Sequence, residues 1–155
     1  MDIKVIANAL CRKYDTRNPF DLAGSLGIIV CHEPLGEIQG YYNKCFRQQF
    51  IHINEDLNGF DAAFTCGHEL AHSVLHPDLN TPFLRKHTLF SVDKLETQAN
   101  RFALDVLYDD DELRFLLERP ITDAAAYMGI PLALAEYRMR TVEPTFWGSA
   151  MRCVI

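Results

Sequence analysis

Residues 61–76 read DAAFTCGHELAHSVLH, and this run decides how the rest of the chain is interpreted. Its apolar side chains, among them Phe64 and Leu70, recur at the spacing of an amphipathic helix, which we expect to end at residue 75. His68 and His72 are four residues apart. On a helix they therefore share one face, where two imidazoles can reach one metal ion.

Glu69 completes the pattern His-Glu-x-x-His, which is typical of zinc peptidases. It follows the first histidine directly, so it can hold a metal-bound water without binding the metal itself. A catalytic zinc usually has three protein ligands and leaves the fourth position open. The next long helix, expected from about residue 92 to 107, offers Glu96 as the third ligand. Asn100 follows one turn later and can accept a hydrogen bond from a ligand imidazole.

The remaining segments predict a small sheet before these two helices and shorter helices after them. Upstream, the patterns indicate helices at residues 3–14 and 19–26 and strands at 28–31, 40–43 and 49–53. Downstream, they indicate helices at 110–117, 122–128 and 131–140. This order predicts an α+β fold with a mostly antiparallel three-stranded sheet, two central metal-binding helices and a helical C-terminal half. Ala99 and Ala103 are small enough to let the two central helices approach closely.

Composition narrows the class of protein. The 155 residues carry a formal net charge of -6 with no basic stripe, which argues against direct nucleic-acid binding. The acidic run at residues 109–112 is expected to open a solvated helix. Five cysteines without Cys-x-x-Cys spacing indicate a reducing compartment. Neither a signal peptide nor a membrane span is evident, so we expect the cytoplasm.

Two motifs in this order resemble the ImmA/IrrE family of bacterial metallopeptidases. They are GHELAHSVLH at residues 67–76 and ETQANRFA at residues 96–103. Shorter upstream segments resemble the family as well: PFDLA at 19–23, LGI at 26–28, GYY at 40–42 and IHIN at 51–54. The resemblance is clearest from roughly residue 15 to 107 and continues more weakly to about 140.

The resemblance implies a glutamate-type zincin, in which His68, His72 and Glu96 bind one zinc ion and Glu69 is the general base. From the order of elements we expect one peptidase domain over residues 1–143, with a helical subdomain at about 110–141, and a C-terminal tail at 144–155. Family members encoded on prophages and integrative elements are anti-repressors that cleave a helix-turn-helix repressor. The expected partner is therefore such a repressor, and neither nucleic acid nor a membrane is expected.

Two other classes of protein remain open. One is a regulatory module that holds zinc structurally and relieves repression by sequestering the repressor without cleaving it. The general base Glu69 argues against this module, because a structural site has no use for one. The other is a ferrous oxygenase with two histidines and a carboxylate, which the His-Glu-x-x-His helix disfavours.

Several other polar residues could also act at the site. Tyr41, Tyr42, His76 and His87 are the polar candidates for stabilising an oxyanion, and the sequence does not choose among them. The two tyrosines either line the cleft or place one ring in the core and one outside. His76 is interpreted as a helix-end residue rather than a ligand. Cys66 is expected to pack inside the helix rather than act as a nucleophile.

Two further segments suggest protein binding. The strand around residues 50–53 is expected to form a sheet edge that accepts an extended peptide. Residues 121–131 read as helix, tight turn and helix, which is the pattern of helix-turn-helix DNA binders. The following helix has Arg138 and Arg140, too few basic residues to grip phosphates. We therefore favour packing or repressor recognition for this segment over DNA binding.

Overall fold

The computed structural model describes residues 1–80 and 91–144, so the predictions for His87 and for the tail after Pro144 lie outside the described residues. The chain divides into two compact units, Met1–Leu107 and Tyr108–Ile155. The prediction of one peptidase domain over residues 1–143 stays a prediction. Within the described ranges, no helix combines the length and apolar composition needed to cross a bilayer.

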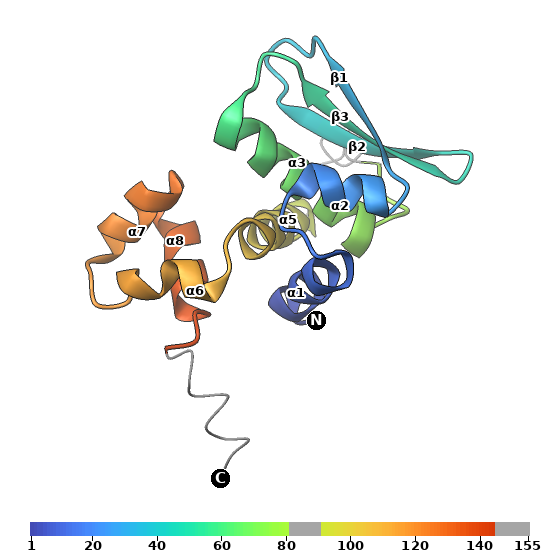
Figure 1. Cartoon of the computed structure of the whole chain (residues 1–155). Coiled ribbons are helices and arrows are strands. Elements are labelled where there is room, and N and C mark those ends of the chain that lie inside the picture. The colour runs from blue at the N-terminus through green and yellow to red at the C-terminus, as the bar shows by residue number, and fades with distance from the viewer. Residues whose placement is uncertain (81–90, 145–155) are drawn as a thin grey trace. The chain divides into compact units, whose positions relative to one another are not determined.

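The first unit packs a three-stranded sheet against a group of helices (Figure 1). Its helices are α1 (Ile3–Tyr14), α2 (Pro19–Ser25), α3 (Gly59–Leu75) and α5 (Ser91–Leu107), and its strands are β1 (Ile29–Glu33), β2 (Gly40–Cys45) and β3 (Gln48–Asn54). Helix α3 packs against α5, α2, β2 and β3, so it is the centre of this unit. The predicted α+β class is confirmed.

The sheet has the strand order β1-β3-β2 and is mixed. β2 and β3 pair antiparallel, as expected for most of the sheet, in a hairpin closed by Phe46 and Arg47, which both have positive φ. β1 instead runs parallel to β3, so the expected mostly antiparallel pairing holds for only one of the two ladders. The connection at residues 34–39 passes β3 to reach β2, which is two strand spacings or about 10 Å away, and it is long enough to do so.

β3 is the central strand, which corrects the prediction that residues 50–53 form a sheet edge. Ile51 and Ile53 of β3 are fully buried, and so is Tyr42 of β2. These side chains belong to the same apolar core as Leu70 and Ala71 of α3. The edges of this sheet are β1 and β2, so any peptide that extends the sheet must add to one of those two strands.

α3 and α5 approach closely because small residues face each other. A Cβ atom placed on Gly67 would lie 3.2 Å from Ala103 Cβ and 3.3 Å from Ala103 Cα. Ala99 and Ala103 are fully buried, as their size suggested. The close approach lets a side chain as short as glutamate reach from one helix to the other.

The second unit, described to residue 144, has an apolar core of its own. Its elements are α6 (Asp110–Leu113), the 3-10 turn η1 (Arg114–Leu116), α7 (Ile121–Met128) and α8 (Leu132–Arg140). Gly129, with a φ of 65°, ends α7, and α8 begins after Pro131, which forms the predicted helix, tight turn and helix. The helix predicted over 110–117 is broken between α6 and η1.

Candidate metal centre

α3 carries His68, Glu69 and His72 on its buried side. The helix begins after Asn58, two residues earlier than predicted, and ends with His76 as its C-cap. His72 is fully buried, and Glu69 and His68 are only 1% and 9% exposed. Side chains of this polarity are rarely buried so deeply unless they are paired or bind a metal. Their burial indicates that the motif forms a binding site inside the domain rather than a solvated face of the helix.

Glu96 reaches this site from α5. Its Oε2 lies 2.9 Å from His68 Nε2, and its Oε1 lies 3.2 Å from His72 Nε2. Burial raises the pKa of Glu96, but contacts with the two histidines and their charge outweigh burial and hold that pKa far below its usual range. Burial lowers the pKa of His68, but the carboxylates of Glu96 and Glu69 raise it overall. The structure thus brings together the three residues that the sequence singled out.

This donor set fits a divalent cation. His72 Nε2 and Glu96 Oε1 are buried without a hydrogen-bond partner, although they lie 3.2 Å apart. One ligand atom from each of His68, His72 and Glu96 lies within 4.8 Å of the other two. Ligands about 2.1 Å from a tetrahedral zinc ion are about 3.4 Å from one another. The two histidine–carboxylate separations, 2.9 and 3.2 Å, are near that value, and a cation would satisfy the two atoms that have no hydrogen-bond partner.

The second ring nitrogen of His68 and of His72 also has a contact. His68 Nδ1 lies 2.7 Å from Asn100 Oδ1, the contact that the helix spacing suggested. His72 Nδ1 lies 3.4 Å from His76 Nδ1, and His76 Nε2 lies 2.8 Å from Gln98 Oε1. Burial lowers the pKa of His76, which favours its neutral form. Such contacts fix the orientation of a ligand imidazole.

A cavity of about 170 Å³ opens beside the cluster. It is lined by Gln39 and Gly40 of the β2 end, Phe64, Thr65, His68 and Glu69 of α3, and Glu96 and Asn100 of α5. A Cβ atom on Gly40 would lie 2.8 Å from Thr65 Cγ2 and 2.7 Å from the carbonyl oxygen of His52. Glycine is therefore required where β2 passes α3.

The sequence prediction missed Gln39, Thr65 and Gln98. Thr65 precedes Glu69 by four residues, so helical spacing from the motif could have found it. Gln39 reaches the cavity only because of where β2 lies against α3. Gln98 reaches His76 only because of the rotation of α5. Neither of these two arrangements has a local sequence signal.

The oxyanion candidates have other contacts. Tyr42 is fully buried and its hydroxyl donates to the carbonyl oxygen of Pro77 at 2.6 Å. Tyr41 stacks on His52, with ring centroids 4.1 Å apart. The tyrosine pair therefore places one ring in the core and the other outside it. Neither tyrosine, nor His76, is among the residues that line the cavity.

The remaining histidines and Cys66 have structural surroundings. His52 Nδ1 lies 2.6 Å from Glu33 Oε1, and His32 stacks on Phe20. Cys66 is fully buried, and burial raises the pKa of its thiol to about 12. A protonated, inaccessible thiol is a poor nucleophile. Cys66 therefore packs inside the helix, as predicted.

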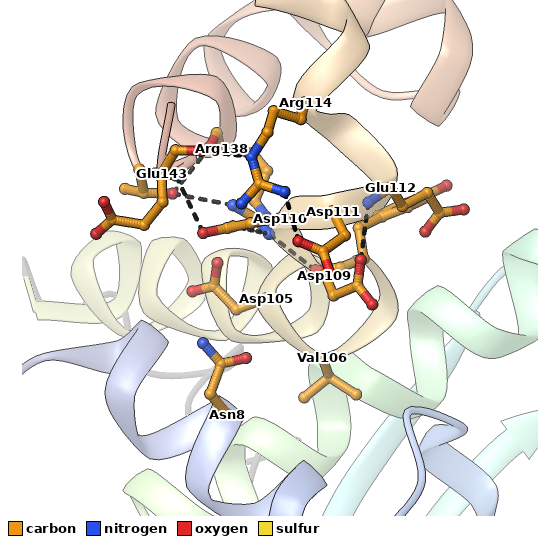
Figure 2. A network of polar contacts seen from close by, with 12 residues as sticks. Asn8, Asp105, Val106, Asp109, Asp110, Asp111, Glu112, Arg114, Arg138 and Glu143 are labelled. Carbon is orange, nitrogen blue, oxygen red and sulfur yellow. Dashed lines mark hydrogen bonds and ion pairs between the residues drawn. The ribbon is translucent and has the colours of Figure 1, made fainter. Parts of the chain in front are cut away.

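Arg138 of α8 is buried and does not serve as a surface cation. It is 1% exposed, and its Nη2 donates to the carbonyl oxygen of Tyr108 at 2.8 Å and to Asp110 Oδ1 at 2.9 Å (Figure 2). Arg140 is the exposed one of the two arginines considered for phosphate binding. The loss of one candidate cation to the core weakens the case for DNA binding by this helix.

Two histidines on one helix, a carboxylate on the next and a small sheet beside them define a zincin-like metallopeptidase domain. The chain belongs to the M78 peptidase family, because residues 23–140 match the profile described as the IrrE N-terminal-like domain. Membership implies a divalent metal, in agreement with the donor set that His68, His72 and Glu96 present.

Two curated relatives support the same family. Over 139 residues, which cover 88% of each sequence, the chain is 41% identical to "Uncharacterized immunity region protein 2" of Bacillus phage phi105. Over 146 residues, 90% of this chain and 85% of the relative, it is 28% identical to "Metallopeptidase ImmA" of Bacillus subtilis strain 168. The resemblance to the ImmA/IrrE family is thereby confirmed.

Proposed function

We propose that this chain is a zinc-dependent endopeptidase that cleaves a helix-turn-helix transcriptional repressor and so relieves repression of mobile-element or stress genes. His68, His72 and Glu96 would bind the zinc, with Glu69 as general base and Asn100 holding His68. The observation that carries the proposal is the buried convergence of two imidazoles and a carboxylate, with two acceptor atoms lacking partners.

The roles of the side chains follow from their places in the cavity. Bound zinc would act as a Lewis acid on the scissile carbonyl and would lower the pKa of a coordinated water. Glu69 lines the cavity next to His68, so its carboxylate can take a proton from the attacking water and pass it to the leaving amine. Asn100 keeps the Nε2 atom of His68 turned towards Glu96 by accepting a hydrogen bond from Nδ1.

The substrate is proposed to bind along β2. The cavity begins at Gln39 and Gly40, where this edge strand starts, and an extended peptide can add to a sheet edge by main-chain hydrogen bonds. At the other end of β2, the backbone N–H of Lys44 donates to Asn80 Oδ1 at 2.9 Å. An uncleaved substrate should therefore slow amide hydrogen exchange near Gly40 more than in β1. Equal protection of both edges would contradict this path.

A repressor substrate is supported by the relatives rather than by the site. One relative is named for a phage immunity region and another is ImmA, and the family resemblance implies anti-repressors that cleave helix-turn-helix repressors. The natural candidate substrate is a small helix-turn-helix protein encoded beside this gene.

The deciding experiment combines zinc content with cleavage of that neighbouring repressor. Glu69→Gln removes the general base but none of the three ligands. It should retain about one zinc per chain while cleavage falls by roughly 10²–10⁴-fold. The matched control is Glu37→Gln, a change at an exposed glutamate outside the cavity lining, which should leave both quantities unchanged. Normal cleavage by Glu69→Gln would show that the mechanism is wrong.

The same variant separates peptidase activity from sequestration. A module that only binds the repressor would still relieve repression when Glu69 is replaced, and no repressor fragment would form. A peptidase would lose relief of repression and fragments together. A reporter assay with immunoblotting of the repressor measures both quantities in one experiment.

A further inference from the structure

In His68 and His72, the two proposed metal ligands, the Nδ1 atoms are contacted by different side chains. His68 contacts a single amide, since its Nδ1 lies 2.7 Å from Asn100 Oδ1. His72 is followed by a chain of two contacts, to His76 Nδ1 at 3.4 Å and from His76 Nε2 to Gln98 Oε1 at 2.8 Å. We propose that His76 and Gln98 are positioning residues that fix the protonation and orientation of His72 for metal binding. This inference rests on the proposed zinc site.

The direction of the hydrogen bonds follows from the acceptor at the end of the chain. Gln98 Oε1 can only accept, so His76 Nε2 carries a proton. In a neutral imidazole the other nitrogen is then a bare acceptor, so His76 Nδ1 accepts from His72 Nδ1–H. The single proton of a neutral His72 is thereby placed on Nδ1. Its Nε2 keeps a lone pair, and this is the atom that lies 3.2 Å from Glu96 Oε1.

This arrangement explains an atom that has no hydrogen-bond partner. His72 is fully buried, and its Nε2 has none. If the proton sat on His72 Nε2, that nitrogen could not bind a metal, and the bare Nδ1 of His72 would face the bare Nδ1 of His76. The contact with Gln98 selects the tautomer in which His72 is a ligand.

His76 is well placed for this role by the end of the helix. It is the C-cap of α3, where its backbone leaves the helical conformation, yet its N–H still donates to the carbonyl oxygen of His72 at 2.9 Å. Backbone and side chain therefore both tie His76 to His72. The sequence analysis interpreted His76 as a helix-end residue, which is correct for its backbone but omits this contact of its ring.

The test measures zinc affinity by competition with a chromophoric chelator in the full chain. His76→Phe keeps a ring but removes both nitrogens, and it should weaken zinc binding about 10–100-fold. His76→Asn places an acceptor oxygen near the position of Nδ1 and should recover affinity to within about threefold of the natural protein. The matched control is His32→Phe, the same substitution at a strand histidine stacked on Phe20, which should have no effect.

Gln98 provides an independent variant on a half-exposed position of α5. Gln98→Leu should weaken zinc binding, whereas Gln98→Glu keeps an acceptor for His76 Nε2–H and should restore it. Combining Gln98→Leu with His76→Phe should cost no more affinity than His76→Phe alone, because both changes act on one chain of contacts. Additive losses would overturn the inference.

A second readout reports the proton directly. Long-range ¹H–¹⁵N spectra of the zinc-loaded protein should show Nδ1–H on His72 in the natural chain, and a weakened or exchanging signal in His76→Phe. If His76→Phe binds zinc as tightly as the natural protein, the proposal is wrong. If the natural protein takes up no zinc, the proposed function fails first and this inference with it. Zinc uptake without peptide cleavage contradicts only the activity and leaves the positioning test intact.

Discussion

In the described part of each unit a cluster of charged side chains is buried, and the two clusters are balanced in different ways. In the second unit, Arg138 lies against Asp110, whose Oδ1 accepts from the guanidinium at 2.9 Å and whose Oδ2 accepts from the N–H of Glu143 at 3.1 Å (Figure 2). In the first unit, Glu69 and Glu96 lie beside two histidines, and none of the described residues that line their cavity is a lysine or an arginine.

This difference indicates a different role for each cluster. A buried carboxylate is stable when a cation and hydrogen bonds compensate it. Asp110 has a cation within the chain, so that cluster serves the fold. Glu96 Oε1 has no hydrogen-bond partner, and neither has His72 Nε2. In this cluster the carboxylate of Glu96 faces imidazoles rather than a lysine or arginine, and two converging atoms have no hydrogen-bond partner, so the cluster is suited to bind a metal cation from outside. This contrast separates a structural ion pair from a candidate metal site.

The largest expected effect comes from replacing Arg138, the cation that compensates Asp110. Arg138→Met leaves Asp110, which is 16% exposed, without its counter-charge. We expect the free energy of unfolding of the second unit to fall by about 3–5 kcal/mol. Hydrogen exchange of the α7 and α8 amides measures this loss. Arg140→Met, at an exposed position of the same helix, is the matched control and should change stability by less than about 0.5 kcal/mol.

Replacing Asp110 in the same chain tests the reason for that loss. Arg138→Met combined with Asp110→Asn should recover part of the stability, because no uncompensated charge is then buried. If the single variant is as stable as the natural protein, Arg138 does not balance a buried charge and the contrast between the two clusters disappears.

The next largest effect is expected from adding zinc to the candidate metal site. Zinc at about 100 times its dissociation constant should stabilise the folded chain by about 2.7 kcal/mol relative to the chelated protein. Hydrogen exchange should slow in α3 and α5, which carry the ligands. Glu96→Gln keeps the size of the side chain but removes its charge, and it should lose most of this gain. An equal gain in that variant would mean that the metal binds somewhere else.

The sequence predicted the local part of this picture well. His68 and His72 needed only a helix, and the apolar spacing of residues 61–75 specified one. Glu96 and Asn100 needed a second helix that packs against the first, and Ala99 and Ala103 indicated such packing. Apart from the broken helix at 110–117, the predicted element bounds differed from the observed ones by no more than two residues, because helix and strand ends depend on capping and on tertiary contacts.

What the sequence did not predict depends on contacts between distant segments. The pairing of β1 with β3 is a choice among strand neighbours that the connecting residues do not determine. Tyr41 and Tyr42 could exchange sides with a one-residue change of register, so their roles were open. The acidic run at 109–112 was expected to be solvated, but Asp110 turns inward to Arg138, a partner 28 residues away.

The smallest expected effect tests the close packing of α3 against α5, which brings His68, His72 and Glu96 together. Gly67→Ala places a methyl group 3.2 Å from Ala103 Cβ and 3.3 Å from the Ala103 backbone, which cannot rotate away. Alanine favours a helix over glycine by about 1 kcal/mol, whereas overpacking costs about 1–3 kcal/mol. We expect a net loss of roughly 1 kcal/mol, measured by chemical denaturation.

The same change should weaken zinc binding, because separating α3 from α5 moves Glu96 away from His68 and His72. Adding Ala103→Gly removes the opposing methyl group but leaves the 3.3 Å contact with the backbone at residue 103, so it should restore part of the zinc affinity. The second glycine itself costs about 1 kcal/mol of helix stability, so the double variant should bind zinc more tightly than Gly67→Ala without becoming more stable. If affinity instead follows stability across these variants, the spacing of the two helices does not set the geometry of the ligands.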